Sequence, residues 1–260
     1  MSPPRHHRLH SSRLVALLAQ WTQAGGAAPA PAPGDVAEQL GQWLSTVDAV
    51  TLGRSLHAIE ALPADLGRLP DVDALESAFQ HTRAELIALA SAPPTPPKPL
   101  RERADNTRAA APDPAAEADF AQHAPRYLAL QKQMDARLQA LRAQVRQALA
   151  QGPRALRQLA VLDAVMEQMA APREQRLWAA LPGHLERRFA QLRQTHQERL
   201  QALGQDDEPR RWRDGGGWLA TFERDLQALL LAEMHVRLEP VTGLLEAARN
   251  AKNMTLEAQE

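Results

Sequence analysis

Apolar residues recur at spacings of three and four along most of this chain, which is the pattern of amphipathic α-helices. Ser11 or Ser12 precedes the first of these stripes and can cap a helix. Asp35 precedes a second stripe, and Asp71 or Asp73 precedes a third. We therefore predict N-terminal helices with these apolar faces: Leu14, Leu17, Leu18 and Trp21; Val36, Leu40, Trp43, Leu44 and Val47, continuing through Leu52, Leu56, Ile59 and Leu62 as one helix or as two; Leu75, Phe79, Leu86 and Leu89.

The most regular stripe lies in the second half of the chain, between Tyr127 and Ala148. Its four-three alternation is typical of a coiled-coil seam, and such a seam has to be buried. The spacing leaves open whether it packs within one chain or between two chains, so a homo-oligomer remains an alternative. We take as interaction candidates the seam residues Met134, Leu138, Leu141 and Val145.

Further helical stripes follow, separated by prolines and glycines. Pro153 ends the seam helix, Pro172 occupies the position of a first helical residue, and Pro182 interrupts the pattern. Residues 204–217 form a polar, Gly-rich loop, and Pro240 is expected to kink or end the last helix. The apolar positions are Leu156, Leu159, Leu162, Val165, Met166 and Met169; Leu177, Trp178 and Leu181; Leu185, Phe189, Leu192, His196, Leu200 and Leu203; Trp218, Phe222, Leu226, Leu229, Leu230 and Met234.

A Pro-rich segment divides these helices into two groups. It contains five prolines within seven residues, together with charged and small residues that have little to bury. The sequence thus predicts an all-α fold with an N-terminal helical module (residues 1–91), a linker (92–114) and a C-terminal helical bundle or coiled-coil hairpin (115–250).

Composition and charge support a helical protein without a strongly charged partner. Apolar residues make up 44% of the chain but aromatic residues only 4%, and residues that favour strands are few. The 30 basic and 31 acidic residues nearly cancel, so no field favours nucleic acid or an anionic membrane surface. The chain has no cysteine, which excludes disulfides, thiol catalysis and Cys-based metal sites.

The first residues resemble a secretion signal but do not complete one. Arg5, Arg8 and Arg13 precede the apolar run 14–18, which is cut short by Gln20. No run of about 18 apolar residues occurs elsewhere, so no membrane insertion is expected. We expect a cytoplasmic protein that reaches a membrane, if at all, through a partner.

Candidate catalytic and metal-binding patterns are weak. The cluster of His6, His7 and His10 has no acidic ligand nearby and is better explained as a basic tail. Glu233 and His235 fall on different helix faces. The triple glycine 215–217 lacks the Lys-Ser/Thr of a phosphate-binding loop and a preceding strand. We therefore expect no enzyme activity, no cofactor and no bound metal.

One loop combines arginine with tryptophan, as surfaces that bind nucleic acids or carboxylates do. Four acidic residues flank it and reduce its positive field: Asp206, Asp207, Glu208 and Asp214. Contact with a protein partner, contact with nucleic acid and an inert solvated loop all remain open. The remaining interaction candidates are Arg210, Arg211, Trp212 and Arg213.

Three stretches together resemble an uncharacterised proteobacterial family of about this length. They are SSRLVALLAQW, LGQWLSTVDAVTLGRSLHAIEAL and VLDAVMEQMAAPREQRLWAALPGHLERRF. The family is similar to accessory components encoded beside MotA/TolQ-like and OmpA-like proteins, in gene sets that resemble type III Zorya anti-phage systems. The resemblance implies a cytosolic helical adaptor for a proton-driven membrane motor, with a MotA/TolQ-like subunit as partner and no catalytic residue. The alternative is a nucleic-acid-binding effector of the same system, which balanced charge disfavours.

Overall fold

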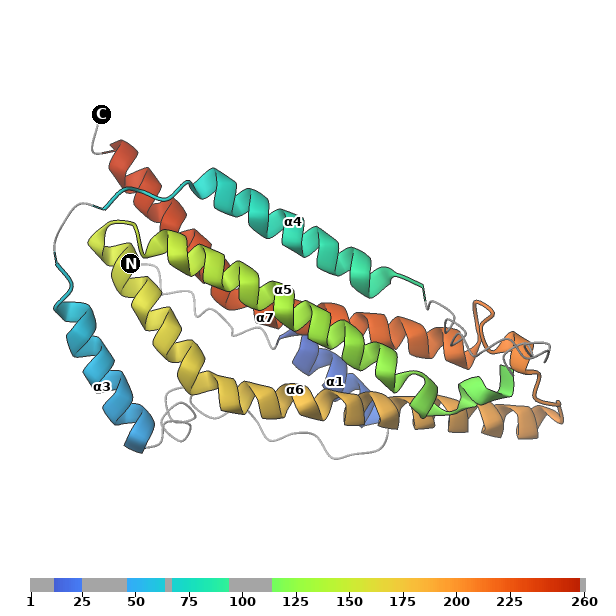
Figure 1. The fold of residues 1–260 in the computed structure, drawn as a ribbon. Helices are drawn as coiled ribbons and strands as arrows, with labels where there is room; N and C mark the ends of the chain where they lie inside the picture. Colours follow the sequence, from blue (N-terminus) through green and yellow to red (C-terminus); the bar gives the residue numbers. More distant parts are fainter. Residues whose placement is uncertain (1–11, 25–45, 64–66, 94–113, 258–260) are drawn as a thin grey trace, which may run out of the picture.

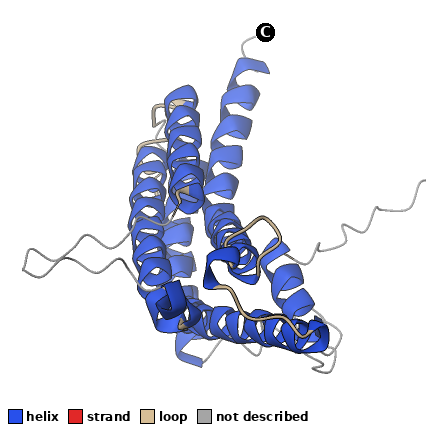
Figure 2. Cartoon of the chain, turned by 90° about the vertical axis from the view of Figure 1, so that its right-hand side faces the viewer, coloured by secondary structure: helices blue, strands red, loops and turns tan. Residues whose placement is uncertain are grey.

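The computed structural model describes residues 12–24, 46–63, 67–93 and 114–257. Within these ranges the chain forms α-helices, short 3-10 helices and loops, and no strand (Figure 2). The prediction of an all-α fold is thereby confirmed. The helices are α1 (Arg13–Ala24), α3 (Thr46–Glu60), α4 (Val72–Ser91), α5 (Ala124–Leu149), α6 (Arg154–Leu203) and α7 (Trp218–Glu257), with the 3-10 helices η1 (Pro114–Ala118), η2 (Phe120–Gln122) and η3 (Pro209–Arg211).

Two of the predicted capping residues begin their helices. The hydroxyl of Ser12 accepts a hydrogen bond from the backbone N–H of Val15 at 3.3 Å, at the start of α1. The carboxylate of Asp71 accepts one from the N–H of Ala74 at 3.0 Å, at the start of α4. Such caps satisfy N–H groups that have no partner inside the helix. The cap predicted at Asp35 lies outside the described residues.

The helices form an elongated bundle in which the long helices α5, α6 and α7 pack against one another (Figure 1). α4 packs along α5 and α7, α1 packs on α7, and α3 packs on the first half of α6 (Figure 1). One hydrophobic cluster includes Trp21 of α1, Leu86 of α4, Leu141 of α5, Leu185 of α6 and Leu229 of α7. Helices from both sides of the predicted linker therefore share one core, and α1 and α4 do not bury their apolar faces in a core of their own.

An ionic cluster ties α5 to α6 in a helical hairpin. Arg142 donates to Asp163 at 2.7 Å, and Arg146 donates to Asp163 and Glu167 at 2.9 and 2.5 Å. Asp163 is only 9% exposed, so its charge is compensated by two guanidinium groups. A partly buried carboxylate needs such partners because it has lost most of its water.

The predicted breaks at Pro172 and Pro182 are wrong, because α6 is one helix of 50 residues that contains both. A proline has no N–H to donate to the carbonyl four residues earlier. At Pro182 that carbonyl belongs to Trp178, and the side chain of Gln131 on α5 donates to it at 3.3 Å. α6 changes direction along its length (Figure 1), as helices that contain proline do. The alternative that Pro240 ends the last helix is wrong too, since α7 continues to Glu257.

None of the described helices combines the length and the hydrophobicity needed to cross a membrane.

Candidate functional site

The seam predicted from the four-three alternation is buried inside the chain. Met134, Leu138, Leu141 and Val145 are 4%, 5%, 3% and 0% exposed, and all belong to the hydrophobic core. Since α4, α6 and α7 pack against α5, these side chains are already covered by the chain's own helices. Of the two arrangements that the sequence left open, the structure shows packing within one chain.

Trp212, predicted as part of an interaction surface, is an internal anchor. It is 5% exposed, and its indole N–H donates to the carboxylate of Asp207 at 2.6 Å. Its ring lies 5.4 Å from that of Trp218, the first residue of α7. His196 of α6 shares the same oxygen of Asp207, at 3.0 Å. The loop 204–217 thus contacts α7 through the ring of Trp212, and it contacts α6 through Asp207, which binds both Trp212 and His196.

The three arginines beside Trp212 differ in what they contact. Arg213 donates to Glu117 of η1 and to Glu223 of α7, and these two carboxylates raise its pKa. Arg211 pairs with Glu208 at 3.2 Å while remaining 72% exposed. Arg210 is exposed. The cluster therefore does not form one cationic face, because Arg213 is neutralised by two carboxylates of the chain and Arg211 is paired with a third.

Gly217, the last of the three glycines at 215–217, lets the Trp212 carbonyl approach the first turn of α7. A Cβ on Gly217 would lie 2.1 Å from the carbonyl oxygen of Trp212, so only glycine allows this approach. The same carbonyl accepts hydrogen bonds from the N–H groups of Leu219 and Ala220, each at 3.1 Å. Because these N–H groups are already satisfied, they are not available to hold a phosphate.

A buried polar network that sequence reasoning missed joins α5, α6 and α7. Glu233 is 0% exposed and accepts hydrogen bonds from Tyr127 and Gln131, each at 3.0 Å. Arg237, one turn later, contacts Glu233 at 2.6 Å and Asp135 at 2.7 Å. The Arg237 guanidinium also lies 4.4 Å from the ring centre of Trp178. Glu233 is thus held by three side chains of the chain itself, Tyr127, Gln131 and Arg237.

A sequence signal for this network existed. Glu233 and Arg237 continue the apolar stripe of α7, because Glu233 lies three positions after Leu230 and Arg237 four positions after Glu233. Charged residues on a buried stripe, one turn apart and of opposite sign, indicate a buried ion pair. His235 is exposed, in agreement with the prediction that it and Glu233 lie on different faces.

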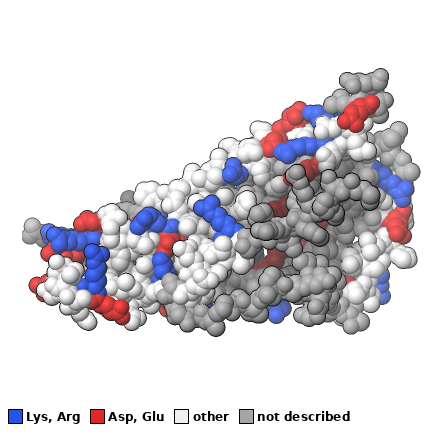
Figure 3. Space-filling model, turned by 180° about the vertical axis from the view of Figure 1, so that it is seen from behind, with Lys and Arg blue, Asp and Glu red and all other residues white. Residues whose placement is uncertain are grey.

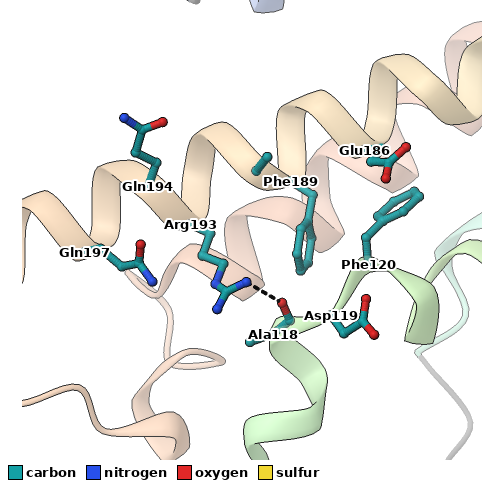
Figure 4. A pocket seen from close by; sticks show the side chains of 9 residues that line it. Ala118, Asp119, Phe120, Glu186, Phe189, Arg193, Gln194 and Gln197 are labelled. Carbon is teal, nitrogen blue, oxygen red and sulfur yellow. Dashed lines mark hydrogen bonds between the residues drawn. The ribbon is translucent and has the colours of Figure 1, made fainter.

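Two hollows lie at the end of the bundle where the 3-10 helices meet α6. The larger, of about 510 Å³, lies between η1–η2 and α6 (Figure 4). Arg193 extends across it from α6 and donates to the carbonyl of Ala118 at 3.1 Å. The rings of Phe120 and Phe189 lie beside this contact, with centroids 5.7 Å apart. Arg193 and Ala118 also border the second hollow, so they separate the two.

No group of three or more His, Asp or Glu side chains suited to a metal ion occurs among the described residues. His6, His7 and His10 lie outside them. Basic and acidic side chains are intermixed on the face shown in Figure 3, without an extended area of one sign. This distribution agrees with the balanced charge of the sequence.

α3 carries the most exposed large apolar side chain in the described part of the chain. Val47 is 74% exposed and Val50, one turn later, is 49% exposed. α3 is held on α6 by a hydrogen bond from Arg173 to Asp48 at 3.0 Å and by one from Gln158 to the carbonyl of Ile59 at 3.0 Å. We call Val47 and Val50 the α3 face. Among the described elements α3 packs mainly on α6, and the α3 face is exposed.

Comparison with known proteins gives one result that bears on identity. Neither the curated proteins nor the solved structures contain a match to this chain. A family described as "Protein of unknown function (DUF3348)" matches residues 1–250, which is nearly the whole chain. The chain therefore belongs to the DUF3348 family.

Proposed function

We propose that this protein is a non-enzymatic helical adaptor of a MotA/TolQ-like membrane motor complex in anti-phage defence, and that it binds a protein subunit through the α3 face. The observation that carries the binding mode is the pair Val47 and Val50, both exposed on a helix that packs mainly on α6 among the described elements. A partner that covers such side chains gains the free energy of removing them from water, about 25 cal/mol per Å². The identity of the complex rests on the family resemblance of the sequence.

The surface chemistry supports a protein partner over nucleic acid. Nucleic-acid binding requires several cationic groups on one face, because each contacts a phosphate. In the predicted cluster, Arg213 is engaged by two carboxylates and Arg211 by a third. Exposed Arg210 is the remaining arginine of the cluster, and one cation is too little to neutralise a run of phosphates.

The proposal places the chain in the cytoplasm, where it reaches the membrane through the motor subunit. This placement rests on the same family resemblance as the identity of the complex. No step of catalysis is included, because the buried carboxylates Asp163 and Glu233 are both occupied by arginines of the chain.

The test is co-purification of the full chain with a MotA/TolQ-like subunit that has been solubilised in detergent. We expect the native chain to be retained and the double variant Val47→Glu, Val50→Glu to be lost. Glutamate near the N-terminus of α3 is compatible with the helix dipole, so the variant is expected to fold.

The matched control is Leu203→Glu, which changes an equally apolar side chain, 56% exposed, at the last residue of α6. It should bind as the native chain does. Equal loss in the control, or full retention of the double variant, would contradict binding through the α3 face. Salt-resistant binding of duplex DNA that depends on Arg210 and Arg211 would favour the effector alternative instead.

A further inference from the structure

The second hollow at the end of the bundle, which we call the tip pocket, has a volume of about 280 Å³. It lies where α6, η1, η3 and the start of α7 meet. Its apolar walls include Trp212, Trp218, Pro209 and Ala118, and its polar groups include Arg193 and Asp207. A small pocket with apolar walls and a few polar groups is the usual form of a site for a small molecule.

Trp218 is a buried wall of the tip pocket. The residue is 5% exposed, yet its indole N–H has no hydrogen-bond acceptor in the part of the chain that the structure describes. Trp212, its neighbour in the same pocket, has its own indole N–H bonded to Asp207. Buried N–H groups in proteins are nearly always paired, because an unpaired one has lost its water without compensation. The indole nitrogen is itself shielded from solvent, so Trp218 contributes an apolar wall to the tip pocket rather than an accessible donor.

Asp207 and Arg193 supply opposite charges at the same pocket. Trp212 and His196 both donate to one oxygen of Asp207, Oδ1, which leaves Oδ2 without a hydrogen bond from the described residues. Burial raises the pKa of the Asp207 carboxyl, but hydrogen bonds from Trp212 and His196 and the charges of His196 and Arg193 outweigh burial, and the pKa lies below its ordinary value. The carboxyl is thus ionised at neutral pH.

Arg193 forms no ion pair within the described chain, since its hydrogen bond goes to the Ala118 carbonyl. The remaining N–H groups of its guanidinium can hold a carboxylate, and a planar guanidinium suits that group. A ligand that carries only a negative charge would meet the repulsion of Asp207, and one that carries only a positive charge would meet that of Arg193.

We propose that the tip pocket binds a free α-amino acid with a short aliphatic side chain. The carboxylate of the amino acid pairs with Arg193, and the ring of Trp218 closes the pocket beside it. Its ammonium group pairs with Oδ2 of Asp207, and its side chain lies against the apolar walls formed by Trp212 and Pro209. This site is separate from the α3 face, and neither proposal depends on the other.

The test follows the indole N–H resonances of the full chain by NMR during titration with valine. The Trp218 resonance is assigned by its loss in Trp218→Phe. We expect a saturable shift of this resonance at millimolar valine. Arg193→Gln and Asp207→Asn should each weaken binding roughly tenfold to a hundredfold, as expected for the loss of a hydrogen bond to a charged group. The asparagine of the second variant keeps an acceptor for Trp212, so a single, well-resolved Trp212 indole resonance that is protected from exchange reports that the loop stays folded.

Two matched ligands and one matched variant complete the test. Isovalerate lacks the ammonium group of valine and isobutylamine lacks its carboxylate, so both should bind much more weakly. Arg210→Gln, an exposed change on the same loop outside the pocket, should bind valine as the native chain does. Binding of isovalerate or isobutylamine as tight as that of valine would overturn the proposal, as would the absence of a saturable shift with every α-amino acid.

Discussion

The hydroxyl of Tyr127 on α5 donates a 3.0 Å hydrogen bond to the carboxylate of Glu233 on α7, and neither side chain is exposed. Burial raises the pKa of the Tyr127 hydroxyl, and the charge of Glu233 raises it further. The hydroxyl is therefore protonated at neutral pH and remains a donor. This bond and the ion pair between Arg237 and Asp135 connect the middle of α7 to α5.

Removing Arg237 should be far more damaging than removing the whole ion pair. In Arg237→Met the buried carboxylate of Glu233 loses its compensating charge, which costs about 3–5 kcal/mol in the free energy of unfolding. The double variant Arg237→Met, Glu233→Leu removes both charges and should recover a large part of that loss. Urea unfolding measures both. A double variant that is no more stable than Arg237→Met would contradict the explanation.

Gln131 should matter for the continuity of α6. Gln131→Leu leaves the Trp178 carbonyl without its donor at the position that Pro182 opens, and it also removes one hydrogen bond to Glu233, so the local exchange near Pro182 is the deciding readout. We expect a loss of about 1–3 kcal/mol and faster amide hydrogen exchange near Pro182 than elsewhere in α6. Gln139→Leu is the control, because this residue of α5 bonds to Asp135 at the surface. Equal effects of the two variants would argue against a special role for Gln131.

The seam should stabilise the single chain. Leu141 is 3% exposed, so Leu141→Ala is expected to cost about 2–5 kcal/mol, which urea unfolding will measure. Leu128→Ala on the same helix, at a side chain 49% exposed, should cost much less. The melting temperature of Leu141→Ala should not depend on protein concentration, since the contact lies within one chain. A dependence on concentration would place the seam between chains.

Acid should loosen the loop 204–217 before the rest of the bundle. The pKa of Asp207 is lower in the folded chain than in the unfolded one, so the unfolded state binds its proton first as pH falls. The contribution of Asp207 is therefore complete above the ordinary aspartate pKa and is lost as pH falls through the folded value. The Trp212 indole N–H resonance should move over this interval. In Asp207→Asn the movement should be absent, and its persistence would assign the change to another group.

Proteolysis tests the division into modules. The Pro-rich sequence of residues 92–114 predicts that a protease cuts there first. Because α1 and α4 share a core with α5, α6 and α7, the two fragments should stay together during gel filtration under native conditions. Fragments that separate would show two independent modules. Early cuts within 127–149 would contradict the helical hairpin.

The stripes of apolar residues predicted which faces are buried, because a helix that packs in water has to hide its apolar side. Leu14, Trp21, Leu75 and Leu185 illustrate this, since each was placed on a stripe and is buried. Stripes do not show where a helix continues, however. At Pro182, where α6 continues, the Trp178 carbonyl is satisfied by Gln131, which lies 47 positions earlier in the sequence. No local pattern contains that contact.

The candidate sites were less predictable for a similar reason. The Arg–Trp cluster was a sound local signal, but its meaning changed when the fold brought Glu117 to Arg213. The tip pocket depends on Arg193, Asp207 and Trp218, which belong to three different elements. No local sequence pattern distinguishes any of them, because the pocket forms only where the three elements meet at the end of the bundle.

The shared core also determines what the chain can tolerate between α4 and η1. Since both sides are already held by side-chain packing, the connecting residues need only span the distance between them. The entropic cost of closing such a connection rises slowly, by about 0.6 kcal/mol for each doubling of its length. Insertions there, including an entire folded domain, should leave the bundle intact, so members of the family can differ greatly in this segment and still fold alike.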